Sequence, residues 1–166
     1  MSISKRLKFI ADLVSPGPCA ADIGTDHALV PVYLLKENRV SKVIAVDISR
    51  ECVKKALEAA DKYHLEGRLE ARLSNGLENI SPGEVSSIVI SGMGGILMTQ
   101  ILTDGLDVVK STKELILSPH RDSNLVREFL KSNDLEIVLD EVIEDKKKKY
   151  CVIKAVNKRF FLKETP

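Results

Sequence analysis

The sequence predicts an α/β protein with a Rossmann-like, doubly wound sheet of seven strands in the order 3-2-1-4-5-7-6. Short apolar runs alternate with segments of helical period along most of the 166 residues, a pattern typical of β-α-β units. Trp is absent and aromatic residues make up 4% of the chain, so aliphatic side chains must fill the core, as in parallel sheets covered by helices. The last two expected strands follow one another without a helix, which predicts a terminal antiparallel hairpin.

The first half of the chain is expected to form three strands and three helices. Apolar residues at helical spacing predict a first helix over Ile3–Val14, and the turn-forming residues 15–18 end it. The strands are expected at Cys19–Ile23, Lys42–Asp47 and Leu69–Leu73. The helices between them are expected at Ala28–Glu37 and at Ile48–Leu65, the second capped by Ser49.

The second half is expected to complete five β/α repeats and to add the hairpin. Its strands are expected at Ser86–Ile90, Glu114–Leu117, Leu135–Ile143 and Lys149–Val156, the last two pairing across Glu144–Lys148. Its helices are expected at Gly95–Leu102, with a continuation past Gly105, and at Ser123–Ser132, capped by Ser123. A plain dinucleotide-binding fold would place a helix between its last two strands. The terminal hairpin is instead typical of the class I methyltransferase sheet.

Composition and charge point to one cytoplasmic domain over residues 1–166. The three cysteines are odd in number and widely spaced, which argues against a disulfide framework and favours a reducing compartment. The start of the chain has no signal-type apolar run, and no apolar stretch reaches the roughly 20 residues that span a bilayer. His and Cys lie at no metal-ligand spacing. We expect no membrane association, no bound metal, and a monomer or a weak dimer.

The formal net charge of +1 gives no global sign of nucleic-acid binding. From Val142 to Pro166, however, the chain carries eight basic residues and three acidic ones. This segment is either a solvated hairpin tip and tail or an edge that contacts phosphates. In the second case Lys146–Lys149, Arg121 and Arg127 are the candidate contacts.

The loop after the first strand is the first candidate site, because ligands of doubly wound sheets bind at the carboxyl ends of the strands where the strand order reverses. Asp22, Gly24, Asp26 and His27 lie there. Gly24 allows a sharp turn and a close approach of the backbone to a ligand. The other glycines of a G-x-G-x-x-G motif are missing. A carboxylate in their place would repel a pyrophosphate but suits a cationic ligand or a proton acceptor. The alternative is a helix cap at Asp26 beside a surface histidine.

The loops after the second and third strands suggest contacts to a nucleoside. Asp47, followed by Ile48, lies where an acidic side chain can accept hydrogen bonds from both ribose hydroxyls. The alternative is one more charge at a helix N-terminus. The Asn75 amide is placed to bond an adenine edge, and Gly76 allows close approach. Asn-Gly is also a common turn pair.

The loop after the fourth strand contains three glycines in the run Ser91-Gly92-Met93-Gly94-Gly95. Bare backbone there can meet substrate or cofactor, and Met93 can lie along a planar base; the alternative is a tight turn. After the fifth strand, His120 and Arg121 either reach the same mouth or belong to a proline-led loop.

These motifs together resemble the bacterial tRNA (adenine-22-N1)-methyltransferases, the TrmK family. Residues 21–28, with Pro31 and Tyr33-Leu34, resemble its first motif, and residues 90–95, with Ile101-Leu102, resemble its glycine-rich motif. Asn75-Gly76-Leu77 lies where the family tends to have Asp-Gly-Leu, and Arg6-Leu7 and Tyr150 also match. The similarity runs from about Ser4 to Val156.

The resemblance implies transfer of a methyl group from S-adenosyl-L-methionine to N1 of an adenine in tRNA. It implies that Asp26 is the catalytic acid/base, and His27 beside it is a second candidate. The candidate cofactor-binding residues are Asp22, Gly24, Asp47, Ile48, Asn75, Gly76, Ser91, Gly92, Met93 and Gly94.

Departures from the family keep other functions open. The family usually continues into a helical C-terminal domain, which we expect to be absent because the chain ends at Pro166. Ser49-Arg50 stands where the family often has Gly-Pro, and Ser118-Pro119-His120 where it tends to have Gln-Pro-Asn. The alternatives are a methyltransferase for a small molecule or a protein, and a non-catalytic binding module. A nicotinamide-dependent oxidoreductase is disfavoured by the single glycine after the first strand.

Overall fold

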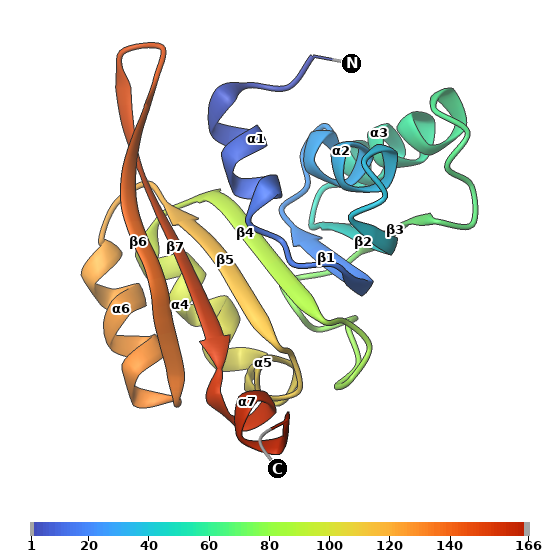
Figure 1. Cartoon of the computed structure of the whole chain (residues 1–166). Helices are drawn as coiled ribbons and strands as arrows, with labels where there is room; N and C mark the ends of the chain where they lie inside the picture. The colour runs from blue at the N-terminus through green and yellow to red at the C-terminus, as the bar shows by residue number, and fades with distance from the viewer. Residues whose placement is uncertain (1, 165–166) are drawn as a thin grey trace.

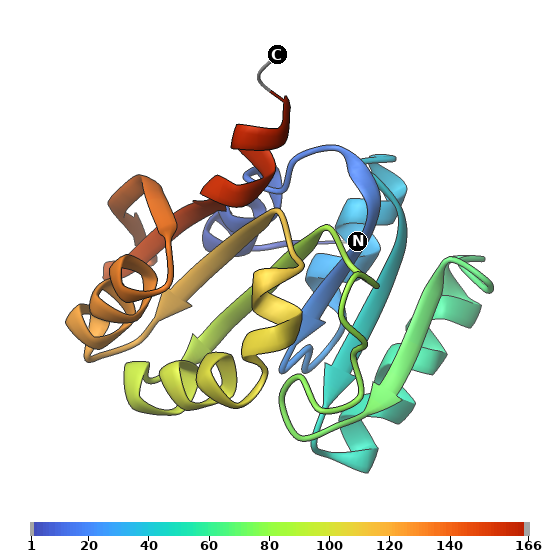
Figure 2. The same ribbon diagram turned by 90° about the horizontal axis from the view of Figure 1, so that it is seen from below.

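The computed structural model describes residues 2–164. It contains one seven-stranded sheet, with helices on both faces (Figures 1 and 2). The strand order is β3-β2-β1-β4-β5-β7-β6, which confirms the predicted topology. The strands are β1 (Gly17–Ile23), β2 (Val40–Asp47), β3 (Leu69–Leu73), β4 (Ser87–Met93), β5 (Glu114–Pro119), β6 (Leu135–Asp145) and β7 (Lys148–Asn157). Strands β1 to β5 pair in parallel with one another, whereas β7 pairs antiparallel with both β5 and β6.

Two apolar cores lie on opposite faces of the sheet, because successive side chains of a strand point to opposite faces. One core is covered by α1 (Lys5–Asp12), α2 (Leu29–Lys36) and α3 (Arg50–Lys62). The other is covered by α4 (Gly95–Asp104), α5 (Leu106–Lys110) and α6 (Ser123–Ser132). Neighbouring residues of β1 show the alternation, since Ala20 belongs to the first core and Ala21 to the second. This doubly wound arrangement leaves the carboxyl ends of the parallel strands open for a site.

The helix ends agree with the expected ones in most places and differ from them in two. Ser49 caps α3 as expected, its hydroxyl accepting from the Cys52 amide at 3.3 Å, and Pro31 lies in the first turn of α2. The expectation that Ser123 caps α6 is wrong, because Ser123 is already helical and Asp122 holds the cap position in a left-handed conformation. The helix that begins at Gly95 ends at Asp104, and Gly105 separates it from α5.

The expected count of five β/α repeats is also wrong. Residues 74–86, all of which the structure describes, join β3 to β4 through turns and contain no helix. A final helix, α7 (Lys158–Glu164), follows the hairpin and was not expected. In Figure 1 the hairpin tip extends beyond one end of the sheet, and α7 lies at the other end of β7. No helix among the described residues is long and apolar enough to cross a membrane. The single domain expected over residues 1–166 includes residues 1, 165 and 166, which lie outside the described range.

Candidate active site

A cavity of about 310 Å³ opens at the carboxyl ends of β1, β2 and β4, where the strand order reverses. This is the position at which doubly wound sheets bind ligands. Seven of the twelve candidate catalytic and cofactor-binding residues line it. The lining residues are Arg6, Leu7, Asp22, Gly24, Thr25, Asp26, His27, Leu29, Val30, Asp47, Ser91 and Gly92. The cavity, called the switch-point cavity below, therefore collects most of the predicted site.

The loop from β1 to α2 is held in a conformation that needs glycine at its first position. Gly24 has a φ of +76°, in the left-handed region that other residues avoid. A Cβ on Gly24 would lie 2.6 Å from Cε of Met93, so the methionine tip covers the loop. The amides of Gly24 and Thr25 both donate to the Val46 carbonyl, at 2.8 and 3.0 Å. The backbone of this loop is thus fixed against β2 before any ligand arrives.

Asp47 joins this loop to the start of α3. Its Oδ2 accepts from the Asp26 amide at 3.2 Å and its Oδ1 accepts from the Ser49 amide at 2.9 Å. A carboxylate offers about four acceptor positions, so two of them are used and the others remain for ribose hydroxyls. Asp26 does not cap α2, because Ala28 holds the cap position. The Asp26 side chain is 69% exposed, with its Oδ1 3.8 Å from both His27 Nε2 and Cys52 Sγ.

Asp22 is a buried carboxyl at the floor of the switch-point cavity. It is 4% exposed. Burial raises the pKa of this carboxyl to about 7, since the charged form loses its hydration; the Thr25 hydroxyl opposes the shift and the Asp47 charge adds to it. A cationic group placed in the cavity would favour the ionised form. Together Asp22, Asp26 and Asp47 make the cavity suited to a cation.

The raised pKa of Asp22 predicts how the free energy of unfolding depends on pH. The Asp22 carboxyl of the unfolded chain loses its proton near pH 4, whereas that of the folded protein keeps it until about pH 7. Between these two pH values the stability of the ligand-free protein therefore falls as the pH rises. The Asp22→Asn variant should lose this pH dependence. Its free energy of unfolding should exceed that of the wild type by an amount that grows from pH 4 and reaches about a few kcal/mol by pH 8. Urea unfolding at several pH values measures it. Parallel profiles would contradict the expectation, and Asp61→Asn, at an exposed carboxylate, is the control.

The predicted adenine contacts lie beside this cavity and do not line it. Asn75 lines a separate cavity of about 230 Å³ together with Leu77, Ile101 and residues that follow α4. Gly76 packs against Ile101, and a Cβ there would lie 3.1 Å from its Cγ2. Ile48 is 70% exposed. The Ser74 amide donates to the Asp47 carbonyl at 3.0 Å, which holds the two groups of residues side by side.

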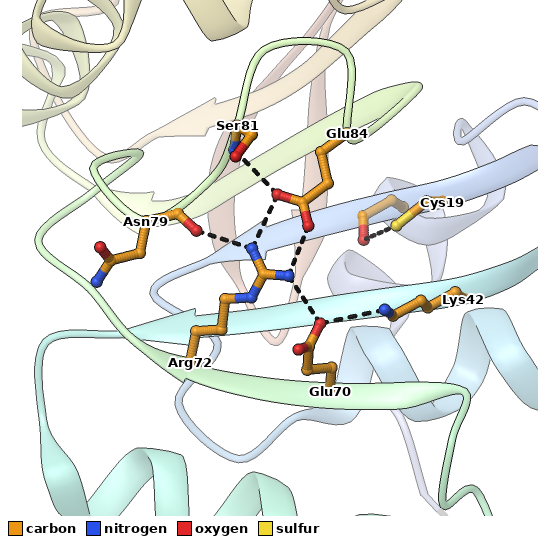
Figure 3. Close-up of polar contacts among 8 residues, drawn as sticks. Cys19, Lys42, Glu70, Arg72, Asn79, Ser81 and Glu84 are labelled. Atoms are coloured by element: carbon orange, nitrogen blue, oxygen red, sulfur yellow. Dashed lines mark hydrogen bonds and ion pairs between the residues drawn. The ribbon is translucent and has the colours of Figure 1, made fainter.

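A salt-bridge network on β3 holds the loop that carries Asn75 (Figure 3). The Arg72 guanidinium donates to both carboxylate oxygens of Glu84 and to the Asn79 carbonyl, and Nη2 also lies 2.9 Å from Glu70. The Arg72 hydrogen bonds lower the pKa of Glu84 to about 2. This bidentate geometry fixes the orientation of both groups. It joins β3 to Asn79 and Glu84 in the loop between β3 and β4, the loop that also contains Asn75.

The glycine-rich loop after β4 is fixed to the loop after β5. The His120 amide donates to the Met93 carbonyl and the Gly95 amide to the Arg121 carbonyl, at 2.9 and 2.8 Å. Pairing between β4 and β5 shifts register between Ser91 and Met93, and such irregularities often re-aim residues beside active sites. Gly92, with a φ of +80°, brings the backbone close to the His120 ring.

Sequence reasoning missed the contribution of α1 to the site. Arg6 and Leu7 line the switch-point cavity. The Arg6 amide donates to Asp145 Oδ2 at 3.0 Å, and its guanidinium lies 4.7 Å from the centre of the Tyr150 ring. These contacts join α1 to the hairpin more than 130 residues later in the chain. In the sequence, only the resemblance to the TrmK family pointed to Arg6-Leu7 and Tyr150. The periodicity of neighbouring residues cannot indicate contacts between distant parts of the chain.

His120 and Arg121 line a third cavity, of about 660 Å³, instead of the switch-point cavity. Arg127, another candidate phosphate contact, is already paired: Nε lies 2.6 Å from Asp140 Oδ2 and Nη2 3.0 Å from Oδ1. Within residues 2–164 no group of three or more His, Cys, Asp or Glu side chains is arranged to hold a metal ion.

Comparison with known proteins identifies the class. The sequence model of the methyltransferase domain family matches residues 3–153, so the chain belongs to that family. The tRNA (adenine(22)-N(1))-methyltransferase of Bacillus subtilis is 34% identical over 155 residues, which are 93% of this chain and 65% of the relative. The chain thus spans slightly less than two thirds of the length of that relative.

Solved structures narrow the class further. A Streptococcus pneumoniae protein in complex with S-adenosyl-L-methionine superposes with a TM-score of 0.90 at 31% identity, covering 94% of this chain and 73% of that one. Mycoplasma capricolum TrmK, solved with S-adenosyl-homocysteine, superposes with a TM-score of 0.87 at 27% identity, covering 95% and 70%. Among the methyltransferases the chain is a member of the TrmK family, which confirms the resemblance read from the sequence.

Proposed function

We propose that this protein transfers a methyl group from S-adenosyl-L-methionine to N1 of an adenine in tRNA. The observation that carries the proposal is the switch-point cavity, in which Asp22, Asp26 and Asp47 surround the Gly24 turn. The TrmK relatives support the reaction and the substrate. Three unpaired cysteines fit a reducing compartment, so we place the activity in the cytoplasm, in a monomer or a weak dimer.

The cavity residues fit the cofactor in charge and in shape. S-adenosyl-L-methionine carries a sulfonium and an ammonium, and the buried Asp22 with Asp26 and Asp47 supplies the opposite charge. Asp47 would accept hydrogen bonds from the ribose hydroxyls, and Ile48, Asn75 and Gly76 would hold the adenine. The backbone of residues 91–94 would lie along the methyl-bearing end, under the Met93 side chain. The fit rests on the carboxylates and on the closely packed Gly24 turn.

When bound, the cofactor supplies an already activated methyl group, so the protein's task is to orient the acceptor. Orientation of this kind can lower a barrier by roughly 7–11 kcal/mol in favourable cases. N1 of a paired adenine is blocked, so the base must be unpaired or flipped at a cost of about a few kcal/mol. The N1 lone pair would form the bond to the methyl carbon as the carbon–sulfur bond of the cofactor breaks. The electron pair of that bond would stay on sulfur, and the positive charge would pass to the methylated ring. Asp26 would accept a hydrogen bond from the exocyclic amino group and stabilise that charge, with His27 beside it.

The Asp26 assignment needs a separate test, because the backbone amide of Asp26 also donates a hydrogen bond to Asp47. Asp26→Asn should lower kcat at least tenfold while the Kd for S-adenosyl-L-methionine changes less than about threefold. If the Kd rises and kcat at saturating cofactor is unchanged, Asp26 serves the cofactor and not the adenine. Single-turnover methyl transfer and calorimetry measure the two quantities separately.

Methyl transfer to bulk unmodified bacterial tRNA tests the proposed function. The protein is incubated with labelled S-adenosyl-L-methionine and the tRNA is digested to nucleosides. We expect N1-methyladenosine as the labelled product. Cofactor binding with label only in protein or in small molecules of a cell extract would favour a different methyl acceptor. Cofactor binding without transfer to anything would favour a non-catalytic module.

A further inference from the structure

We propose that the third cavity, between the loop after β5 and the start of β7, binds the phosphodiester backbone of the RNA next to the target adenine. It is lined by Pro119, His120, Arg121, Ser123, Val142, Lys148, Lys149, Tyr150 and Cys151. We call it the basic cavity. The inference rests on the proposed function, since it names where the RNA lies relative to the switch-point cavity.

The charge of the basic cavity is of one sign. Its lining includes Arg121, Lys148 and Lys149, together with His120, and no acidic side chain. Among the residues that the structure describes, none of these three cations makes an ion pair, although strand register places Glu144 opposite Lys149. Unpaired cations around an open cavity favour a polyanion, because neutralised phosphates release their counterions.

The remaining lining favours a nucleic acid over a small anion. At about 660 Å³ the basic cavity is twice the size of the switch-point cavity, so it has room for more than one phosphate. Tyr150 and the 66% exposed Val142 add apolar surface. Basic residues interleaved with an aromatic ring are how proteins hold unpaired strands, with phosphates on the cations and a base on the ring.

The basic cavity lies beside the switch-point cavity at two places. On one side, a Cβ on Gly92 would lie 3.7 Å from His120 Nε2, and these two residues belong to different cavities. On the other side, Arg6 of the switch-point cavity stacks on Tyr150 of the basic cavity. An adenine held near Gly92 would therefore have its neighbouring phosphates within the basic cavity.

One buried donor supports this path. Nη1 of Arg6 is buried without a hydrogen-bond partner among the described residues, which costs free energy unless a ligand or water supplies an acceptor. It lies on the α1 side of the same junction. The structure also reduces the number of candidate phosphate contacts in the hairpin. Lys146 and Lys147 form its turn, with positive φ, and do not line the basic cavity.

Removing the three cations tests the inference. The variant Arg121→Ala/Lys148→Ala/Lys149→Ala should bind a fluorescently labelled tRNA transcript at least tenfold more weakly than wild type in anisotropy titrations. The slope of log Kd against log salt concentration should fall by about 2 to 3, since each phosphate contact contributes about 0.7 to 0.9. The Kd for S-adenosyl-L-methionine should stay within about twofold, which shows that the fold and the switch-point cavity are intact.

A charge-matched control separates a site from a general charge effect. Lys54→Ala/Lys110→Ala/Lys131→Ala removes three exposed lysines that lie outside the three cavities, and it should leave the salt slope within about 0.5 of wild type. The inference is overturned if the cavity variant binds tRNA like wild type, or if the control loses as much. Because binding is measured without turnover, a wild type that binds tRNA but transfers no methyl group contradicts the proposed function and not this inference.

Discussion

Replacing Asp47 by Ala should weaken binding of S-adenosyl-L-methionine on the order of 100-fold or more. A carboxylate that accepts two hydroxyl hydrogens makes two charge-assisted hydrogen bonds, each worth roughly 1.5–3 kcal/mol, and every 1.4 kcal/mol is about tenfold in Kd. The substitution also frees the Asp26 and Ser49 amides that Asp47 holds, so the loop after β1 loses its anchor. Isothermal titration calorimetry measures the Kd directly.

The matched control for Asp47 is Asp61→Ala, which removes an exposed carboxylate near the end of α3. It should bind the cofactor like wild type. The rise in melting temperature on adding cofactor gives a second measurement, because a ligand stabilises only the fold that binds it. An Asp47→Ala protein that is folded and keeps wild-type affinity would remove Asp47 from the cofactor site.

Replacing Gly95 by Ala should lower the free energy of unfolding by at least about 3 kcal/mol, a size reserved for overpacking and backbone disruption. A Cβ on Gly95 would lie 2.2 Å from the Asp122 carbonyl oxygen and 2.8 Å from that of Arg121. Both are backbone atoms, so relief requires the loop after β5 to move. That movement breaks the Gly95–Arg121 and His120–Met93 hydrogen bonds that join the two loops. Urea denaturation gives the change.

The neighbouring glycine provides the control for this prediction. A Cβ on Gly94 would lie 3.5 Å from the Arg121 Cγ, an ordinary contact, and Gly94 has a φ of −70°. Gly94→Ala should therefore change the free energy of unfolding by less than about 1 kcal/mol. Equal losses at the two positions would mean that the close approach of Gly95 to Asp122 does not decide its identity.

The sheet could be predicted because its signals are local. Strand β2, for example, contains an apolar run at residues 43–46. The missing helix between the last two strands indicated the hairpin and with it the strand order. The errors came where local chemistry was ambiguous. Residues 74–86 connect β3 to β4 through turns alone, where a fifth β/α repeat would need a helix. Ser123 is a good cap by type, but Asp122 takes that position in left-handed geometry.

The sequence predicted most residues of the candidate site, but it did not predict how they are distributed among three cavities. Motif position after each strand was enough to bring Asp22, Gly24 and Asp47 together, because parallel strands end at one edge. Which loops share a cavity depends on long-range packing, so the separation of Asn75 and of His120 from the switch-point cavity was not visible in the sequence. The contribution of Arg6 depends on the hairpin returning over α1. The pKa of Asp22 depends on its depth in the fold.

Methyl transfer to a single defined tRNA position tests the central claim most directly. Two transcripts are compared that differ only at position 22, the position named for the Bacillus subtilis relative: one carries adenine there and the other guanine. We predict one N1-methyladenosine per transcript in the first, seen as a reverse-transcription stop and by nucleoside analysis, and none in the second. Equal labelling of both transcripts would place the methylated adenine at another position of the tRNA. No N1-methyladenosine in either transcript, from a protein that binds S-adenosyl-L-methionine, would contradict the account.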